Sequence, residues 1–294
     1  MNLHCEFYDF YELTGSVVYF YDANYNFVIK EYIMVLKRDP SEPRRLIGDN
    51  TSEIDFLLSL DEIDFPLGAW MLGGDDIVFG SPANDLAYGN EGEDAFYGDL
   101  GNDALFGGRG KDALYGEDGN DTINGGQEAD FLEGDSGNDL LLGGKGNDFI
   151  ISGNGNDTLI GGTGRDYLYS EGDDPSLPKI GSNLYVLQAE PGLRDINNAD
   201  LILPFQVGVD RIGLAGNLNA SDVSLEYLTN VTIVLQLDFP QSFQDFIEPG
   251  ELAPVPTVGS GTLLKVKNSG DMLGFVEAVT PAQIQGSIIS VQGF

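Results

Sequence analysis

The stretch from Met71 to Tyr169 constrains the fold of this 294-residue chain most strongly, because a nine-residue unit recurs there eleven times without an insertion. Read from Gly107, the units are GGRGKDALY, GEDGNDTIN, GGQEADFLE, GDSGNDLLL, GGKGNDFII, SGNGNDTLI and GGTGRDYLY. The fourth position is Gly in nine units, with Ala83 and Glu128 as exceptions. The sixth position is Asp in every unit, as Asp76, Asp85, Asp94, Asp103, Asp112, Asp121, Asp130, Asp139, Asp148, Asp157 and Asp166.

This period predicts a turn and a short strand in each unit. Glycines at positions one, two and four allow a tight turn through positive φ, and the last three residues can form a strand. Two units then make one flattened coil, so each unit stacks on the second unit along the chain. The apolar eighth position faces inward between two parallel sheets, as in Leu105, Leu114, Ile123, Leu132, Leu141, Ile150, Leu159 and Leu168.

Stacking of this kind brings the aspartate carboxylates of successive coils close together, where they repel each other unless cations lie between them. Ca²⁺ suits such a site because it accepts about six to eight oxygen ligands, and glycine-rich turns expose backbone carbonyls. The repeat contains no His or Cys, which disfavours Zn²⁺. Mg²⁺ seldom occupies a site built only from protein oxygens.

The units resemble the GGxGxDxUx nonapeptide of the RTX (repeats-in-toxin) proteins, which bind calcium. The resemblance implies a parallel β-roll. The residue patterns of the flanks complete an all-β fold, with an N-terminal β-rich region and a C-terminal β cap. The resemblance also implies that the eleven aspartates are ligands and that the roll binds at most about nine ions, one for each pair of stacked units. Departures from the pattern at Met71, Ala83 and Glu128 lower that number. Carbonyl ligands are implied at Gly92, Gly101, Gly107, Gly110, Gly116, Gly119, Gly125, Gly134, Gly137, Gly143, Gly146, Gly155, Gly161 and Gly164.

Composition divides the chain into residues 1–70, 71–170 and 171–294 and makes it strongly acidic, with a net charge of −34. Such a charge argues against nucleic acid and anionic membrane surfaces as partners. Cys5 is the only cysteine, so an internal disulfide framework is excluded. The sequence contains no run of about 18 apolar residues, so it predicts no transmembrane segment.

Residues 1–70 have no recognised role. The segments 16–21 and 27–36 are rich in β-branched and aromatic residues and predict a hairpin. Residues 51–60 predict a short helix, with Ile54, Leu57 and Leu58 on one face. The N-terminus lacks the basic segment of a cleaved secretory signal. RTX proteins typically leave Gram-negative cells unfolded through a type I secretion apparatus that reads a C-terminal signal, so the resemblance implies secretion and folding on external calcium.

The C-terminal part predicts an all-β cap for the open end of the solenoid. Strands are expected over 183–188, 199–203, 210–214, 231–237, 262–267, 272–276 and 287–291. The residues YVL at 185–187 and FQVGVDRIGL at 205–214 resemble the segment that follows RTX repeats in many secreted proteins. Pro204 precedes Phe205 where that pattern often has Asp, so the resemblance does not extend to an extra calcium at that turn.

Catalysis is not expected. His4 is the only histidine, and no Gly-x-Ser-x-Gly motif occurs. The ninth position predicts two outward aromatic ladders, Phe79, Tyr97 and Tyr115 on one sheet, and Tyr88 and Phe106 on the other. Such ladders fit a surface glycan, a protein partner or the chain's own N-terminal hairpin.

The sequence predicts a secreted or cell-surface calcium-binding protein with a structural, adhesion or matrix role. Two alternatives remain open at this stage. One is a membrane-acting RTX toxin, and the other is the calcium-dependent module of a polysaccharide-modifying enzyme.

Overall fold

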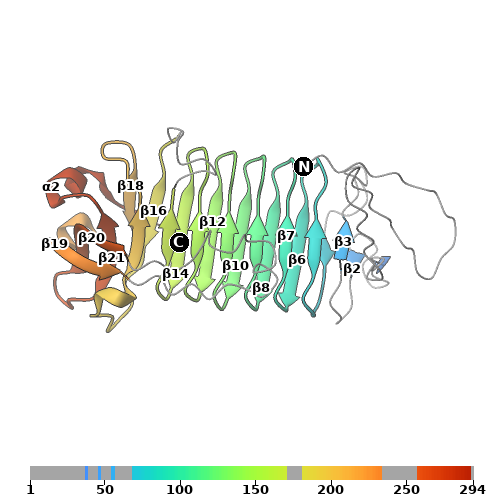
Figure 1. The fold of residues 1–294 in the computed structure, drawn as a ribbon, viewed down its shortest axis with the longest axis horizontal. Coiled ribbons are helices and arrows are strands. Elements are labelled where there is room, and N and C mark those ends of the chain that lie inside the picture. Colours follow the sequence, from blue (N-terminus) through green and yellow to red (C-terminus); the bar gives the residue numbers. More distant parts are fainter. Residues whose placement is uncertain are drawn as a thin grey trace.

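The protein is an elongated roll of two stacked sheets, closed at its C-terminal end by further strands (Figure 1). The computed structural model describes residues 37–38, 46–47, 54–56, 68–170, 181–233 and 257–292. Within these segments, none of the helices combines the length and apolar character that crossing a bilayer requires. The repeat folds as an all-β parallel roll, as predicted, because its strands pair in parallel within two sheets.

The first sheet contains strands of the repeat and of both flanks. Its order is β1-β2-β4-β6-β8-β10-β12-β14-β16-β18-β22, and all neighbours are parallel except β1 and β2. The bounds are β1 Lys37–Arg38, β2 Leu46–Ile47, β4 Ala69–Trp70, β6 Leu86–Glu91, β8 Ala104–Arg109, β10 Thr122–Gln127, β12 Leu140–Lys145, β14 Thr158–Thr163, β16 Leu184–Leu187, β18 Arg211–Leu214 and β22 Ile288–Ser290.

The second sheet lies opposite the first and has the order β3-β5-β7-β9-β11-β13-β15-β17-β21-β20-β19. Its strands are parallel up to β21, and β20 then runs antiparallel to both β21 and β19. The bounds are β3 Ile54–Phe56, β5 Ile77–Phe79, β7 Ala95–Tyr97, β9 Ala113–Tyr115, β11 Phe131–Glu133, β13 Phe149–Ile151, β15 Tyr167–Tyr169, β17 Asp200–Leu203, β19 Val223–Ile233, β20 Thr257–Val266 and β21 Met272–Glu277.

The register confirms that two nonapeptides make one coil. Ile123 of β10 pairs with Leu105 of β8 on one side and Leu141 of β12 on the other, each 18 residues away. In the second sheet, Leu132 likewise lies between Leu114 and Ile150. Successive units therefore alternate between the two sheets.

Between the sheets, the core is a single row of eighth-position side chains. Two further buried clusters pack on the second sheet, one around Phe131 and one around Tyr167. Leu114, Ile123 and Leu132 are completely buried, as predicted. The row continues past the repeat, because Tyr185 pairs with Leu159 and Ile202 pairs with Leu168. Both sheets thus run without a break from the repeat into residues 184–203.

Before the repeat, the structure corrects one prediction. Residues 54–56 form β3, a strand parallel to β5, and not part of a helix. The edge of β5 offers backbone hydrogen bonds to an incoming strand, and this long-range pairing outweighs the helical spacing of Ile54, Leu57 and Leu58. The hairpin predicted over 16–36 lies outside the described residues.

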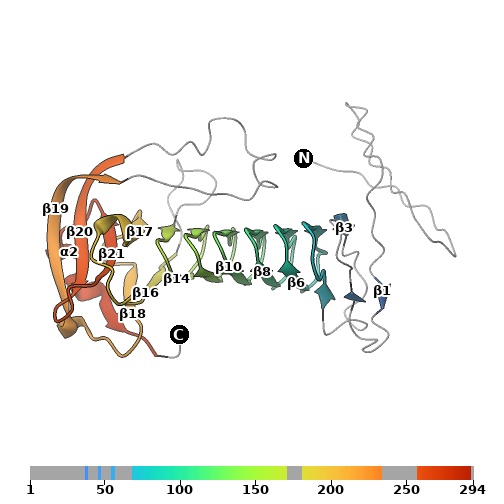
Figure 2. The same cartoon turned by 90° about the horizontal axis from the view of Figure 1, so that it is seen from below.

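The C-terminal strands curl across the end of the roll (Figure 2). Expected strands coincide with β16, β17, β18, β21 and β22, whereas β19 begins at Val223, eight residues before the expected start. Short helices also occur here, η1 Ile196–Asn198, η2 Ala220–Asp222, α2 Pro281–Ile284 and η3 Gln285–Ser287. The length of β19 follows from its pairing with β20 along nearly its whole extent.

The aromatic ladders form as predicted on the outer faces of the sheets. Tyr97 stacks between Phe79 and Tyr115 with ring centroids 5.1 and 4.7 Å away. Tyr88 and Phe106 stack at 4.9 Å on the other sheet.

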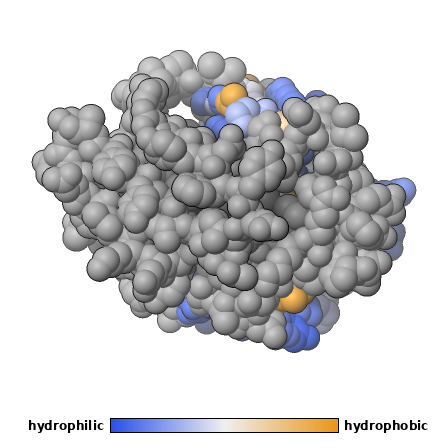
Figure 3. Space-filling model, turned by 90° about the vertical axis from the view of Figure 1, so that its right-hand side faces the viewer, coloured by the Kyte–Doolittle hydropathy of each residue, from blue (hydrophilic) through white to orange (hydrophobic). Residues whose placement is uncertain are grey.

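Viewed from the right-hand side of Figure 1, the coloured surface around the rim is mainly hydrophilic, with only small hydrophobic areas (Figure 3).

Candidate metal centre

The repeat aspartates form two columns, one along each edge of the roll. Each aspartate directly precedes a strand, so the sheet that follows decides which column it joins. The first column precedes strands of the first sheet and contains Asp85, Asp103, Asp121, Asp139 and Asp157. The second column precedes strands of the second sheet and contains Asp76, Asp94, Asp112, Asp130, Asp148 and Asp166.

One hydrogen bond connects each aspartate to the next coil. The backbone N–H of Asp94 donates to Asp112 Oδ1 at 2.9 Å, and that of Asp112 donates to Asp130 Oδ1 at 2.9 Å. The first column repeats the pattern, since Asp103 N–H donates to Asp121 Oδ1 at 2.7 Å. This bond orients the carboxylate that accepts it but uses only one of its two oxygens.

The second oxygen is the distinctive feature of the site. It is fully buried and has no hydrogen-bond partner in a series of aspartates whose side chains lie inside the turns. A buried carboxylate oxygen without a partner is strongly unfavourable unless a cation compensates it. The atoms concerned are Oδ2 of Asp94, Asp103, Asp112, Asp121, Asp130, Asp139, Asp148 and Asp166.

Glycine at the first position leaves space beside this oxygen. A Cβ added to Gly89 would collide with Asp94 Oδ2 and lie 2.6 Å from the carbonyl oxygen of Gly107 in the next coil. A Cβ on Gly143 would likewise meet Asp148 Oδ2 and, at 2.6 Å, the carbonyl oxygen of Gly161. Carboxylate and carbonyl oxygens therefore border the same small space, which a side chain would fill.

The fourth-position glycines keep the coils close together. Gly119 and Gly137 lie directly over the carbonyls of Gly101 and Gly119, where a Cβ would overlap those oxygens. Gly137 has φ +151° and Gly146 has φ +152°, a conformation that L side chains rarely adopt. These glycines thus set the spacing of the columns.

Burial makes the carboxylates difficult to ionise without a counter-ion. Desolvation raises the pKa of Asp121 to about 6, that of Asp103 to about 7 and that of Asp94 to about 8. Desolvation, followed by the charge of Asp112, raises the pKa of Asp130 to about 10. At the spacing of neighbouring strands, two ionised carboxylates repel by about 3–4 kcal/mol at an effective dielectric constant of about 20. A divalent cation between them reverses the sign of this interaction.

The donor set fits Ca²⁺. Within the described part of the chain, no group of three or more His, Cys, Asp or Glu side chains is placed to hold a metal ion. Each site therefore needs carboxylate oxygens together with backbone carbonyls, an oxygen-only set that matches the preference of Ca²⁺. When bound, the ion would supply the positive charge that the buried Oδ2 atoms lack.

Comparison with known protein families agrees with this geometry. The family model described as RTX calcium-binding nonapeptide repeat (4 copies) matches residues 72–105, 97–132 and 133–168. Residues 72–168 therefore match the RTX calcium-binding repeat in sequence. The search of curated proteins returned no match.

The departures from the RTX pattern have different local outcomes. Asp85 in the Ala83 unit differs from the other aspartates, because Ser81 N–H donates to its Oδ2 at 2.6 Å. Glu128 adopts φ +80° in place of glycine, and Asp130 Oδ2 in the same unit still has no partner. The strain at Glu128 costs about 1–2 kcal/mol, which the surrounding coils compensate.

Three residues outside the RTX repeats extend the columns. Asp157 N–H donates to Asn183 Oδ1 at 3.1 Å, and Asn183 N–H donates to Asp210 Oδ1 at 2.9 Å. In the second column, Asp166 N–H donates to Asp200 Oδ1 at 3.1 Å. The sequence signal was an Asp or Asn two residues before an inward apolar residue, but the spacings of 26, 27 and 34 residues break the period of nine.

Proposed function

We propose that this protein is secreted or displayed at the cell surface, where external calcium folds its RTX roll, and that it serves as a structural, adhesion or matrix component. The observation that carries the proposal is the series of buried Oδ2 atoms without hydrogen-bond partners in the two aspartate columns. Without cations, this arrangement combines desolvation with repulsion along the whole length of the roll.

We infer that the row of side chains between the sheets does not offset that cost alone. Each nonapeptide contributes one large inward side chain, such as Leu114, Ile123 or Leu132. Calcium binding therefore supplies free energy that the folded roll requires, and binding and folding are coupled. The chain remains unfolded where calcium is scarce and folds where it is plentiful.

An extracellular location follows from the expected affinity. Calcium sites of extracellular modules often have dissociation constants of about 10⁻⁴–10⁻³ M, so such sites remain empty inside a cell. Export through a type I secretion apparatus suits a chain that is unfolded before it meets calcium. Co-expression with a type I exporter should release the full-length chain into the medium, and retention of the chain inside the cells would contradict this route.

A structural or adhesion role suits the form of the roll. The sheets present stacked, partly exposed rings such as Tyr97 and Phe106, which can contact a cell-surface glycan or a protein partner. We propose that the protein has no catalytic activity.

Far-ultraviolet circular dichroism during a calcium titration tests the proposal. The purified full-length chain is titrated from excess chelator to about 10 mM Ca²⁺, with Mg²⁺ as the control. A cooperative gain of β signal near 10⁻⁴–10⁻³ M with Ca²⁺ alone is expected. A spectrum that is already fully β-rich in chelator would contradict calcium-driven folding.

A further inference from the structure

The two aspartate columns end differently where the repeat meets the C-terminal strands. In the first column, the place of the next aspartate is taken by Asn183, which is 1% exposed. Its amide Nδ2 donates to Ser152 Oγ at 2.7 Å. An uncharged amide and a hydroxyl thus satisfy each other here, and this contact requires no cation.

The next residue of the first column is also satisfied. Asp210 Oδ1 accepts the N–H of Asn183, and Asp210 Oδ2 accepts the N–H of Gln206 at 2.8 Å. At the opposite end of this column, the N–H of Ser81 likewise donates to Asp85 Oδ2. Backbone donors therefore take the role of the ion at both ends.

The second column keeps its charge at the same level of the roll. Asp166 is completely buried, and its Oδ2 has no hydrogen-bond partner. The residue stacked on it is Asp200, which is 6% exposed and accepts the N–H of Asp166 at 3.1 Å. This pair repeats the relationship between Asp112 and Asp130, although 34 residues separate its members.

A third carboxylate borders this end of the column. The N–H of Gly146 donates to the backbone oxygen of Thr163, whereas the equivalent N–H of Gly164 donates to Glu190 Oε1 at 2.6 Å. Glu190 thus replaces a neutral carbonyl with a charged group beside Asp166 and Asp200. The replacement adds negative charge that acts on both Asp166 and Asp200, and the positive charge of Arg165 offsets part of it at Asp200.

We infer that a divalent cation, Ca²⁺ in the extracellular setting, binds between Asp166 and Asp200, at a junction site that joins the last RTX unit to the C-terminal strands. The inference rests on the proposed function, because the ion belongs to the same calcium-loaded roll. It assigns a ligand role to Asp200, which lies outside the nonapeptides, and adds one site to the second column only.

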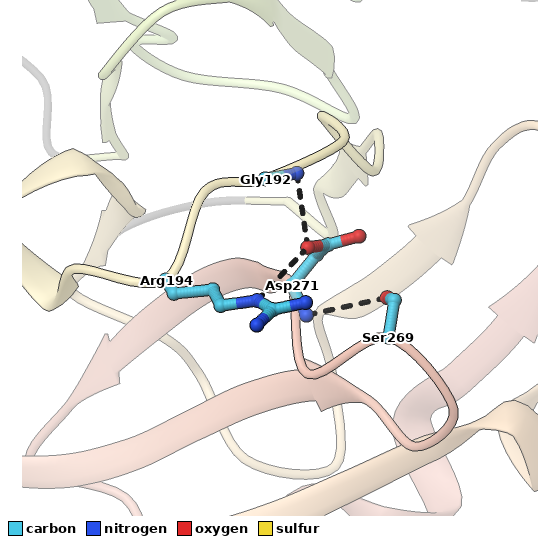
Figure 4. Close-up of polar contacts among 4 residues, drawn as sticks. All are labelled: Gly192, Arg194, Ser269 and Asp271. Carbon is cyan, nitrogen blue, oxygen red and sulfur yellow. Dashed lines mark hydrogen bonds and ion pairs between the residues drawn. The ribbon is translucent and has the colours of Figure 1, made fainter.

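The loop that brings Asp200 to the column is held in place by the C-terminal strands (Figure 4). Asp271 Oδ1 accepts the N–H of Gly192 at 3.0 Å and lies 3.9 Å from Arg194 Nε. The N–H of Met272 also donates to the carbonyl of Leu193 at 2.8 Å. An ion between Asp166 and Asp200 therefore links the roll to the β20–β21 region.

Substitution of Asp200, with a matched control, tests the junction site. Asp200→Asn retains the Oδ1 acceptor but removes the charge, and the calcium bound per chain, measured by equilibrium dialysis against saturating Ca²⁺, should fall by one ion. Asp195→Asn makes the same chemical change at an exposed position of the loop before Asp200, keeps the Oδ1 that accepts the N–H of Asn197, and should retain the wild-type content. An unchanged content in a folded Asp200→Asn protein would overturn the inference.

A crystal structure of the wild-type protein grown with Ca²⁺ decides the matter if the Asp200 variant does not fold. An anomalous difference peak between Asp166 and Asp200 is expected. Peaks within the RTX repeats but none at the junction would refute this inference alone. A chain that binds no calcium at all would refute the proposed function as well.

Discussion

The backbone N–H of Asp112 donates to Asp130 Oδ1 at 2.9 Å, while Asp130 Oδ2 lies buried without a hydrogen-bond partner. One carboxylate thus has two separate tasks. Its first oxygen sets the stacking of the coils, and its second oxygen is available to a cation. This division predicts that stacking and calcium binding can be altered separately.

Asp130→Asn should preserve the stacking bond but weaken the calcium-loaded roll. Loss of one charge from a buried ionic site lowers the calcium-saturated free energy of unfolding by about 3 kcal/mol. In chelator the same change should not destabilise the protein, because it removes a carboxyl that burial disfavours in its charged form. Denaturant unfolding with and without calcium measures both effects.

Asp118→Asn is the matched control for Asp130→Asn, because Asp118 is exposed on a repeat turn. It should change stability by less than about 0.5 kcal/mol in either condition. Equal losses for both variants would indicate a general charge effect instead of an ion site.

Gly107→Ala should raise the calcium concentration needed for folding. The added Cβ would overlap Asp112 Oδ2 and lie 2.6 Å from Asp112 Cγ, so it fills the space that borders the carboxylate. Overpacking of this kind costs about 1–3 kcal/mol. Gly286→Ala, which meets no atom within 4 Å, should leave the calcium midpoint unchanged.

The pH dependence should differ between the calcium-free and calcium-loaded states. Folding raises the aspartate pKa values above 3.8, to about 6 for Asp121, 7 for Asp112 and 8 for Asp139, because burial disfavours the charged form. The folded apo state therefore binds more protons than the unfolded chain between about pH 4 and these values. Its stability is fully present below that window and is lost as the pH rises through about 6 to 8.

Circular dichroism in chelator should therefore show more β structure at pH 5 than at pH 8. With calcium the trend reverses, because protons compete with Ca²⁺ for the carboxylates and raise the calcium midpoint at low pH. An apo stability that increases from pH 5 to pH 8 would contradict the burial of protonated carboxyls.

Leu132→Ala should strongly destabilise the calcium-loaded protein. Leu132 is completely buried between the two sheets, and truncation of such a side chain costs about 2–5 kcal/mol. Leu100, which is 46% exposed on a repeat turn, provides the comparison, and Leu100→Ala should cost less than about 0.5 kcal/mol. Thermal unfolding in saturating calcium distinguishes the two variants.

Much of the roll could be predicted because a strict period of nine turns local preference into long-range register. Asp112 and Asp130 had to meet once two units formed a coil, and the stacking of Tyr97 on Tyr115 followed from the same spacing. Leu132 and its equivalents had to face inward for the same reason. The assignment of ligand roles to the aspartates and glycines stays a prediction.

Beyond the repeat, the period no longer carries this information. The strand at Ile54–Phe56 was wrongly predicted as helix, because its conformation depends on the exposed edge of β5. Asn183 lies 26 residues after Asp157, and Asp200 lies 34 residues after Asp166. Neither separation is a multiple of nine, so the repeat pattern could not place these residues in the columns.

The sequence by itself therefore determined the coil, the inward row and the two aspartate columns, since a repeated short-range pattern specifies each of them. Only the tertiary structure decided how the columns end, with Asn183 satisfied by Ser152 in one and Asp200 stacked on Asp166 in the other. These endings depend on which distant loops reach the last coil, and packing settles that choice.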